Sequence, residues 1–370
     1  MTLGARPVSA PFELERWFAS QAGGQHIDLS SSGALARTLR DLLALASTGE
    51  RDGFDAVSLG YGAPDGARSL RAAIALRHAI GPEDEITVTC GAIEALLLVI
   101  DAVVAEGDEV IVQEPMYGAV GGLARARGAT VVPWPLRPEG GFVGSLDELE
   151  ARIGPRTALV AITQPNSPTG SILDERDLNE LVDMLAPRGV WLLSDEVYRD
   201  LALAPGLVVP SAGGRYDRAV VVGDVAKPFG LGGLRIGWIV ARDPAVRARI
   251  GAGRDYTTLS PPTPSAALAE IALRHADELL AGPLENARVN LDRLRTASTH
   301  RMSLSLVPPR AGATAFPGVS DAERIQRRLA SRGVLVVPGS LFGRPDHLRI
   351  GLAGPVNEFA AGLTQLESLC

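Results

Sequence analysis

Lysine is almost missing from this sequence of 370 residues, which contains thirty-five arginines and one lysine, Lys227. Either residue can carry surface charge, but only the ε-amine of lysine can lose its proton near neutral pH and attack a carbonyl carbon. Lys227 follows the apolar run at 219–222 and precedes a glycine-rich stretch, a position where α/β proteins often place their chemistry. The sequence therefore singles out Lys227 as a candidate Schiff-base lysine, although an arginine-rich composition alone could also leave one lysine behind.

Cysteine and histidine are scarce as well. The two cysteines are Cys90, inside the chain, and Cys370, its last residue, so no disulfide framework is expected. The five histidines are scattered without a close pair, which argues against a zinc site. We therefore expect no bound metal.

Two further absences narrow the class of protein. No apolar run reaches the roughly 18 residues that span a bilayer, and the first seven residues lack a charged start followed by an apolar core. The formal net charge is −7 with a pI near 5.4, and no basic block appears, which argues against a nucleic-acid partner. We expect a cytoplasmic protein with no membrane and no nucleic acid among its partners.

Short β-branched runs alternate with amphipathic segments over most of the chain. Helical segments are predicted at 91–105, 145–153 and 174–185. This order predicts an α/β fold with a mostly parallel, doubly wound sheet and helices on both faces. The predicted strands are 86–88, 109–112, 129–132, 158–162, 190–193, 219–222 and 235–240. The last of them follows its predecessor without an intervening helix, so it is the candidate antiparallel member.

The pattern changes beyond residue 270. Two long helices, 266–280 and 284–294, are followed by short strands near Ser303, Thr314 and Val334. This change predicts a smaller α+β C-terminal domain, as a length of 370 residues also suggests. The predicted units are an N-terminal segment packing on the small domain (1–45), a large cofactor-binding domain (46–270) and the small domain (271–370).

Polar residues follow the carboxyl ends of five predicted strands. Because the carboxyl ends of parallel strands meet at one edge of a sheet, these segments are expected to form a single site. Together they supply amides at a helix start for phosphate, an aromatic face, a carboxylate, a phenol and a lysine. The segments are 89–92, 115–117, 164–170, 195–198 and 224–227.

Seven short motifs, taken in this order, resemble the fold-type-I pyridoxal-phosphate enzymes and specifically the class I/II aminotransferase family. The resemblance extends over about 58–353 and implies the aminotransferase fold type I with pyridoxal 5′-phosphate as the cofactor. The motifs are Tyr61 with Gly66 and Leu70-Arg71, Gly91-Ala92, Pro115-Met116-Tyr117, Pro168-Thr169-Gly170, Asp195-Glu196-Val197-Tyr198, Lys227 with Gly233-Leu234-Arg235-Ile236-Gly237, and His347-Leu348-Arg349-Ile350.

The resemblance implies a role for each residue that its chemistry can support. Lys227 would hold the cofactor as a Schiff base and then move the proton of the substrate Cα. Asp195 would pair with the pyridinium nitrogen, Tyr198 would bond the phenolate oxygen and Tyr117 would stack on the ring. Arg349 would grip the substrate α-carboxylate, for which a planar guanidinium is suited.

The same resemblance implies a phosphate site and a partner subunit. The amides of Gly91, Ala92 and Ile93 at a helix start would bind the phosphate together with Arg235. Tyr61 would reach the phosphate of the neighbouring subunit. A homodimer with a shared active site is therefore expected.

Two positions depart from the family pattern. Ser167 stands where many relatives have an asparagine that bonds the phenolate oxygen, so either Ser167 or the preceding Asn166 is expected to take this place. Asp224 stands where a hydroxyl residue often touches the phosphate. Arg235 is the cation expected to offset the repulsion between that carboxylate and a phosphate.

Three functions remain open from the sequence. An aminotransferase would act on an α-amino acid through an external aldimine, with a 2-oxo acid as amino acceptor. A narrower resemblance, at 27–33, 254–260, 336–343 and 345–347, points to a capreomycidine synthase-like subgroup, which cyclises an arginine-derived amino acid through β-elimination and suggests secondary metabolism. A non-catalytic sensor is the third function, but regulators with this fold carry an N-terminal winged-helix module for which this chain has no room.

Overall fold

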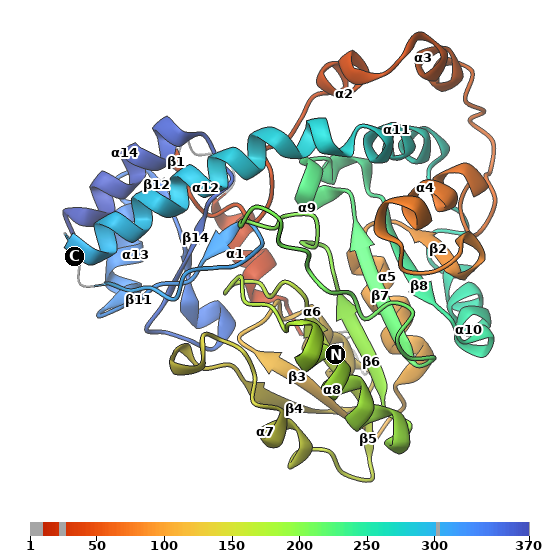
Figure 1. The fold of residues 1–370 in the computed structure, drawn as a ribbon, viewed down its shortest axis with the longest axis horizontal. Helices are drawn as coiled ribbons and strands as arrows, with labels where there is room; N and C mark the ends of the chain where they lie inside the picture. Colours follow the sequence, from red (N-terminus) through yellow and green to blue (C-terminus); the bar gives the residue numbers. More distant parts are fainter. Residues whose placement is uncertain (1–9, 22–26, 301–303, 370) are drawn as a thin grey trace, which may run out of the picture.

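The computed structural model describes residues 10–21, 27–300 and 304–369. Residues 1–7, which lack the pattern of a secretion signal, and Cys370 lie outside these ranges. Within them the chain forms a large α/β unit and a smaller unit of helices and short strands (Figure 1). The strands of the large unit are β2 (Ile86–Thr89), β3 (Glu109–Glu114), β4 (Thr130–Pro135), β5 (Thr157–Thr163), β6 (Trp191–Asp195), β7 (Ala219–Asp224) and β8 (Gly237–Ala241).

These strands form one sheet in the order β2-β8-β7-β6-β5-β3-β4. The pairs among β3, β4, β5, β6 and β7 are parallel, whereas β8 is antiparallel to both β2 and β7. All residues of β7 and of β8 are buried, as is typical of strands covered on both faces. The prediction of a mostly parallel α/β sheet with an antiparallel last strand is confirmed.

Helices cover both faces of the sheet, and a separate hydrophobic cluster fills each interface. On one face, buried residues of α5 (Ala92–Val103), α6 (Ala119–Ala126) and α10 (Pro244–Arg254) pack together. On the other, α4 (Arg68–His78), α8 (Glu175–Leu185) and α11 (Thr263–Arg274) contribute. Figure 1 shows α8 in front of the sheet and α5 behind it. Shorter helices of the large unit are α2 (Leu39–Leu45), α3 (Thr48–Asp55), α7 (Leu146–Glu150) and α9 (Ala226–Phe229).

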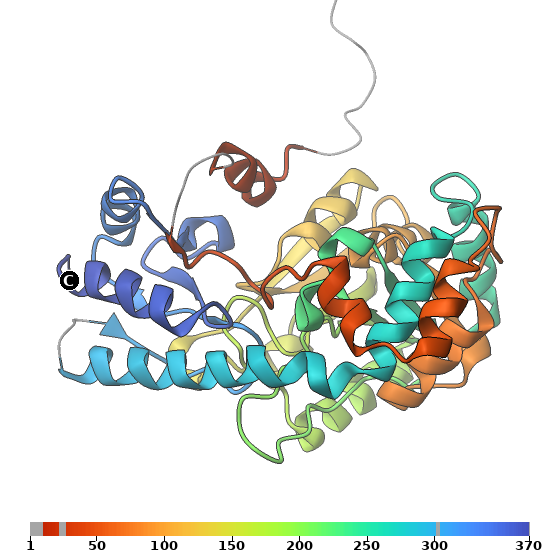
Figure 2. The same ribbon diagram turned by 90° about the horizontal axis from the view of Figure 1, so that it is seen from above.

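One long helix, α12 (Ala276–His300), runs from the large unit along the small one (Figure 2). The prediction of two helices separated near Pro283 was wrong. A proline inside a helix deprives the carbonyl four residues earlier of its partner. Here that carbonyl, on Leu279, accepts a hydrogen bond of 2.6 Å from Arg37 Nη2, so the helix continues through Pro283. The break lies instead at His275, where α11 ends.

The small unit packs short strands against three helices within the described residues. Its core contains side chains of α12, α13 and α14 together with those of the short strands. A strand predicted near Ser303 corresponds to β9, although Ser303 itself lies outside the described residues. The remaining elements are β9 (Leu304–Ser305), β10 (Thr314–Ala315), β11 (Gly318–Val319), α13 (Ala322–Ala330), β12 (Val334–Leu335), β13 (Val337–Pro338), β14 (Leu348–Gly351) and α14 (Val356–Glu367).

The N-terminal segment connects the two units. After α1 (Glu13–Gln21), strand β1 (Ile27–Asp28) pairs in parallel with β12 of the small unit. The chain then crosses to the large unit, where the Ala34 N–H donates to the carbonyl of Lys227 at 2.9 Å. We keep 1–45, 46–270 and 271–370 as the proposed domain boundaries. Among the helices described, α12 included, none combines the length and apolar character needed to cross a membrane.

The buried amide of Asn290 on α12 offers a test of how this helix is held. Its Nδ2 donates to the carbonyls of Leu352 at 2.8 Å and Gly354 at 3.0 Å. Because Asn290→Ala removes both bonds and leaves a cavity, we expect the free energy of unfolding to fall by roughly 2–4 kcal/mol. Urea denaturation followed by circular dichroism measures this change.

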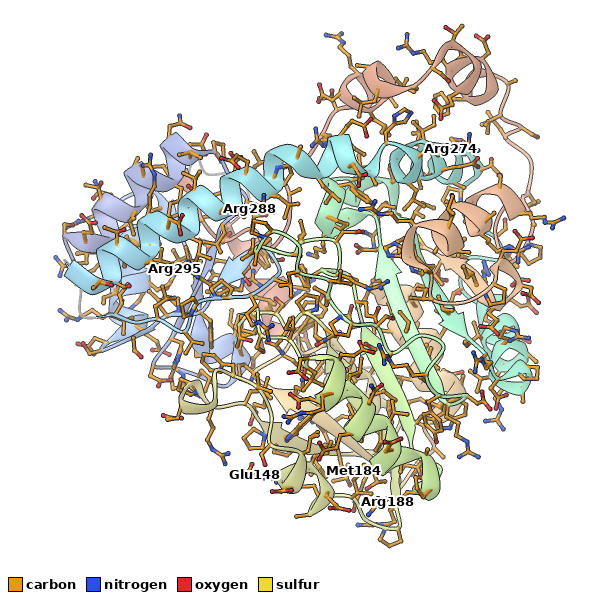
Figure 3. All side chains as sticks on the ribbon, viewed as in Figure 1. Glu148, Met184, Arg188, Arg274, Arg288 and Arg295 are labelled. Atoms are coloured by element: carbon orange, nitrogen blue, oxygen red, sulfur yellow. The ribbon has the colours of Figure 1, made fainter. Side chains whose placement is uncertain are left out.

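Arg295→Ala is the matched control, because Arg295 is an exposed residue of the same helix (Figure 3). Its ion pair with Asp292 is exposed, so the free energy of unfolding should change by less than about 0.5 kcal/mol. Equal losses in the two variants would show that the amide of Asn290 does not hold α12.

Candidate functional site

A cavity of about 490 Å³ opens at the carboxyl edge of the sheet. It collects the strand ends that the parallel topology brings together. Predicted residues from the starts of α5 and α9, from the ends of β6 and β7 and from the small unit share this one space. Those lining it are Ala92, Ile93, Tyr117, Asp195, Tyr198, Asp224, Lys227, Arg235 and Arg349.

Lys227 lies in the first turn after β7. The carboxylate of Asp224, the last residue of that strand, accepts the backbone N–H groups of Ala226 at 3.0 Å and Lys227 at 3.1 Å. The amine of Lys227 donates to the hydroxyl of Ser32 at 3.2 Å. The backbone of Lys227 is thereby held by the end of β7, and its amine is held by the N-terminal segment.

Asp224 lines the cavity, but it is compensated differently from the sequence expectation. Burial raises the pKa of its carboxyl, and the charge of Lys227 opposes that rise most strongly, followed by the two backbone N–H groups. Arg235, the predicted counter-charge, opposes it less than these groups do. The carboxylate therefore serves the turn that carries Lys227.

Asp195 ends β6 as a buried carboxyl, with 5% of its surface exposed. Its Oδ1 accepts the N–H of Val197 at 3.3 Å. Burial raises the pKa of this carboxyl to about 7, and the charge of Asp224 adds to the rise while Lys227 opposes it. A cation placed against Asp195 would reverse this shift, so the position suits a protonated ring nitrogen.

Residues around the start of α5 offer hydrogen-bond donors and positive charge at one edge of the cavity. The helix begins at Ala92 without a side-chain cap, so its first N–H groups have no side-chain acceptor. Arg235 has a φ of 54°, a left-handed conformation that a residue with a side chain seldom adopts. A Cβ on Gly91 would collide with the Arg235 guanidinium, and one on Gly237 would lie 2.6 Å from the Ala92 nitrogen. The two glycines thus allow the start of α5 to pack closely against the segment at 235–237, which places the guanidinium of Arg235 beside the first amides of the helix.

Arg349 on β14 is a buried cation beside the same cavity, with 2% of its surface exposed. Its Nη2 donates to the carbonyl of Ser30 at 2.8 Å, and its guanidinium lies 5.7 Å from the ring of Phe18 and 5.2 Å from that of Phe342. Burial lowers its pKa, and its Nε finds no hydrogen-bond partner within the described ranges. A buried guanidinium with an unused N–H group suits a carboxylate ligand.

Two phenols also line the cavity. Tyr117 donates its hydroxyl to Glu15 Oε1 at 2.8 Å, and its ring lies 5.0 Å from that of Phe12. Burial, with Glu15 as the next cause, raises the pKa of Tyr117, so this phenol stays protonated. Tyr198 is buried at the turn after β6.

Asn166 and Ser167 do not line the cavity, contrary to the sequence expectation. The Asn166 amide is used inside the protein: Nδ2 donates to the Pro115 carbonyl at 3.1 Å, and Oδ1 accepts the N–H and hydroxyl of Thr169 at 3.2 and 2.7 Å. Thr163, at the end of β5, lines the cavity instead. Its hydroxyl has no hydrogen-bond partner in the described part of the chain.

Tyr61 lies elsewhere, with 91% of its surface exposed. It borders a separate hollow of about 680 Å³ formed by α3, the loop at 56–67 and α11. Within one chain it does not contribute to the cavity that holds Lys227. Its predicted contact with a neighbouring subunit stays a prediction.

Among the cavity residues that the sequence motifs missed are Ser32, Glu15 and Thr163. Ser32 lies in a stretch that carried only the narrower resemblance. The next residue is a glycine, Gly33, because a Cβ at that position would lie only 2.9 Å from the Lys227 carbonyl oxygen. Glu15 had no signal, because one acidic residue in a short amphipathic helix has no pattern of its own. Thr163 directly precedes the motif segment that was expected to face the ligand.

The chemical groups of the cavity fit pyridoxal 5′-phosphate, the cofactor that the sequence resemblance implies. Lys227 offers a primary amine for its aldehyde, and the buried carboxyl of Asp195 forms no ion pair with any residue that the structure describes. The uncapped start of α5 with Arg235 offers donors for its phosphate.

The pH dependence of stability tests the burial of Asp195. Its pKa is raised from 3.8 to about 7, so the stability contributed by the protonated carboxyl is present below about pH 4 and is lost as the pH rises through 7. Because Asp195→Asn removes a buried charge, we expect it to raise the melting temperature of the ligand-free protein at pH 8 by roughly 3–6 °C, and by less at pH 5.

Asp292→Asn, at an exposed position of α12, is the control and should give the same small change at both pH values. Thermal denaturation at pH 5 and pH 8 measures the difference. A stabilisation by Asp195→Asn that is no larger at pH 8 than at pH 5 would contradict the raised pKa.

Comparison with known proteins places this geometry in a family. The profile described as aminotransferase class I and II matches residues 45–363. Capreomycidine synthase of Streptomyces vinaceus is 39% identical over 99% of this chain and 95% of its own length, and arginine–pyruvate transaminase of Pseudomonas aeruginosa is 32% identical over 79% and 78%. The crystal structure of the PLP-dependent cyclase OrfR has a TM-score of 0.89 at 32% identity and covers 100% of this chain and 99% of that one. The chain therefore belongs to the class I and II aminotransferase family of pyridoxal-phosphate-dependent enzymes.

Proposed function

We propose that this protein is an aminotransferase that acts on an α-amino acid, with a 2-oxo acid as amino acceptor. One observation carries the proposal: the sole lysine of the sequence lines the same cavity as the buried carboxyl of Asp195 and the buried guanidinium of Arg349. An amine, a carboxyl and a guanidinium are the groups that such a reaction requires for the aldehyde, the ring nitrogen and the substrate carboxylate.

Bound through Lys227, pyridoxal phosphate supplies an electron sink for the negative charge that develops at the substrate Cα. Asp195 would keep the ring nitrogen protonated, and a cation there would also offset the cost of burying this carboxylate, which raises its pKa. Tyr198 would donate to the phenolate oxygen, and Tyr117 would pack on the ring. Tyr117 can do so while its hydroxyl remains bonded to Glu15.

The phosphate is bound by the amides of Gly91, Ala92 and Ile93 together with Arg235. The left-handed conformation of Arg235 supports this assignment, because strain of that kind persists where the surrounding structure requires it. The guanidinium Nη2 donates to the Cys90 carbonyl at 3.4 Å, a contact that keeps it beside the helix start.

Neither Asn166 nor Ser167 lines the cavity, and the Asn166 amide holds the turn that ends at Thr169. Thr163, at the end of β5, is the neighbouring residue that does line it. Asp224 sets the backbone of the Lys227 turn through its two N–H contacts.

Lys227 is also the base that moves the proton of the substrate Cα. When its amine is freed, the Ser32 hydroxyl at 3.2 Å is the group that orients it. Arg349 fixes the substrate α-carboxylate and so limits how the Cα–H bond can turn. Holding both groups in one cavity supplies the orientation on which such proton transfers depend.

A cytoplasmic homodimer with a shared active site is part of the proposal. Leu59 and Tyr61 expose 85% and 91% of their surfaces on the loop before α4. Exposed apolar side chains grouped on one loop are typical of a contact surface. In the dimer, Tyr61 would contribute its hydroxyl to the phosphate site of the partner subunit.

Cyclisation of an arginine-derived amino acid is the second candidate reaction. The similarity to capreomycidine synthase over nearly the whole chain, and to a PLP-dependent cyclase, favours it. The residues assigned above serve both reactions, since each begins with removal of the Cα proton. The difference lies in whether the amine is transferred or a β-substituent leaves.

Borohydride reduction of the holoenzyme tests the role of Lys227. Because the chain has a single lysine, a stable secondary amine on an ε-nitrogen must map to residue 227. We expect Lys227→Arg to fold and to lose turnover by roughly 10²–10⁴-fold or more, since a guanidinium cannot form the Schiff base or move the proton. Peptide mass spectrometry and activity assays measure both effects. A wild-type enzyme without label at Lys227 would refute cofactor attachment there and leave the sensor function. An active Lys227→Arg variant would refute the catalytic role of the lysine.

The fate of the α-nitrogen separates the two reactions. We expect ¹⁵N from the α-amine of an amino acid substrate such as L-arginine to appear in alanine when pyruvate is the acceptor, because an aminotransferase passes this nitrogen on. Mass spectrometry of the products detects the transfer. If β-hydroxylated arginine instead loses one water and keeps its ¹⁵N in a cyclic product, while no labelled alanine forms from either substrate, the cyclase assignment replaces the aminotransferase.

A further inference from the structure

Two charged residues of the cavity have no role in the proposed function, Glu15 and Arg16 of α1. The other charged residues of the cavity have roles in the proposed function. Asp224 binds backbone N–H groups, Asp195, Lys227 and Arg235 are assigned to the cofactor, and Arg349 is assigned to the substrate α-carboxylate. Arg16 is exposed, whereas Glu15 is half-buried. The cavity therefore contains one partly desolvated negative charge that no part of the reaction uses.

Packing of α1 fixes where Glu15 lies. Leu14 is buried in a cluster with Phe142, Phe316 and Phe342. Phe18, one helical turn later, lies against the guanidinium of Arg349 at 5.7 Å. With Leu14 and Phe18 anchored, the adjacent Glu15 is directed into the cavity. Figure 2 shows α1 on the opposite side of the molecule from α12.

The carboxylate of Glu15 is oriented but not neutralised. Its Oε1 accepts the Tyr117 hydroxyl at 2.8 Å. No ion pair joins Glu15 to an arginine among residues 10–21, 27–300 and 304–369, and Oε2 has no hydrogen-bond partner there. One carboxylate oxygen is therefore free of hydrogen bonds from the described residues and can accept N–H groups of a ligand.

We propose that Glu15 is the specificity residue for the substrate side chain and that it binds a guanidinium group, so that the substrates are guanidinium-bearing α-amino acids. This inference rests on the proposed function, in which Arg349 binds the α-carboxylate. A substrate held at that end extends its side chain within the same cavity. A planar guanidinium matches a carboxylate through paired N–H groups, as an ammonium does not.

The charge of Glu15 would also disfavour substrates with neutral side chains. A neutral substrate that fills the cavity would remove water from Glu15 without supplying a cation, which leaves a buried charge unpaired. Selection of this kind acts through the far end of the substrate. It requires no change in the groups around Lys227.

A structural role for Glu15 makes a different prediction. If the carboxylate only anchors α1 through Tyr117, then Glu15→Gln keeps an oxygen acceptor for the phenol and should change ligand binding little. If the charge is needed, the same substitution removes the preference for a guanidinium. Glu13→Gln, the same chemical change at an exposed position of α1, is the matched control.

The test uses the holoenzyme and two ligands that differ only at the far end, 5-guanidinopentanoate and its neutral isostere 5-ureidopentanoate. Both carry a carboxylate for Arg349 and neither has an α-amine, so neither can react at Lys227. By calorimetry we expect the guanidino compound to bind at least roughly tenfold more tightly to the wild type and to Glu13→Gln. In Glu15→Gln the ratio should fall to about twofold or less, with an unchanged melting temperature.

The inference would be overturned if the wild type bound the two compounds equally or bound neither of them. It would also be overturned if Glu15→Gln kept the full preference for the guanidino compound. Its failure can be told apart from failure of the proposed function. A holoenzyme that carries label at Lys227 and transfers the nitrogen of neutral amino acids, yet shows no preference between the two compounds, refutes only the role of Glu15. Absence of label at Lys227 refutes the function itself.

Discussion

The turn that carries Lys227 is the constraint on which the rest of the site depends. The Asp224 carboxylate accepts two backbone N–H groups at the start of the turn, and the Lys227 carbonyl accepts the N–H of Ala34 from the N-terminal segment. A lysine side chain loses conformational entropy when its amine is held in one position. A fixed backbone at Lys227 lowers this entropic cost of placing the amine for reaction. This turn explains why a carboxylate stands beside the proposed phosphate site.

The N-terminal segment joins parts of the site that the sheet alone does not connect. It contributes the Ser32 hydroxyl to Lys227 and the Ser30 carbonyl to Arg349, while β1 pairs with the small unit. Movement of the small unit relative to the sheet would therefore change the surroundings of both the lysine and the arginine. Helix α1 adds Phe18 and Glu15 to the same cavity, so the proposed specificity residue and the proposed base, Lys227, line one space.

Particular elements show where sequence reasoning succeeded and failed. Buried strands such as β5 and β7 were predictable because apolar runs of their length, bounded by turn residues, have few other arrangements. The predicted gap between helices 266–280 and 284–294 was wrong, because the carbonyl that Pro283 leaves without its helical partner does not stay unpaired. Arg37, distant in sequence, pairs with that carbonyl. The surroundings of Asn166 were not predicted either: its amide bonds Thr169 and also Pro115, a residue that is distant in sequence.

The sequence by itself determined the α/β class and the family, and it isolated Lys227, since one amine among thirty-five arginines is a chemical distinction that needs no coordinates. The tertiary structure alone decided how that lysine is surrounded. Burial raises the pKa of Asp195, Thr163 rather than Asn166 lines the cavity, and Glu15 lines it together with Arg349. These features arise from solvent exclusion and from contacts between segments more than a hundred residues apart, and neither is encoded in local spacing.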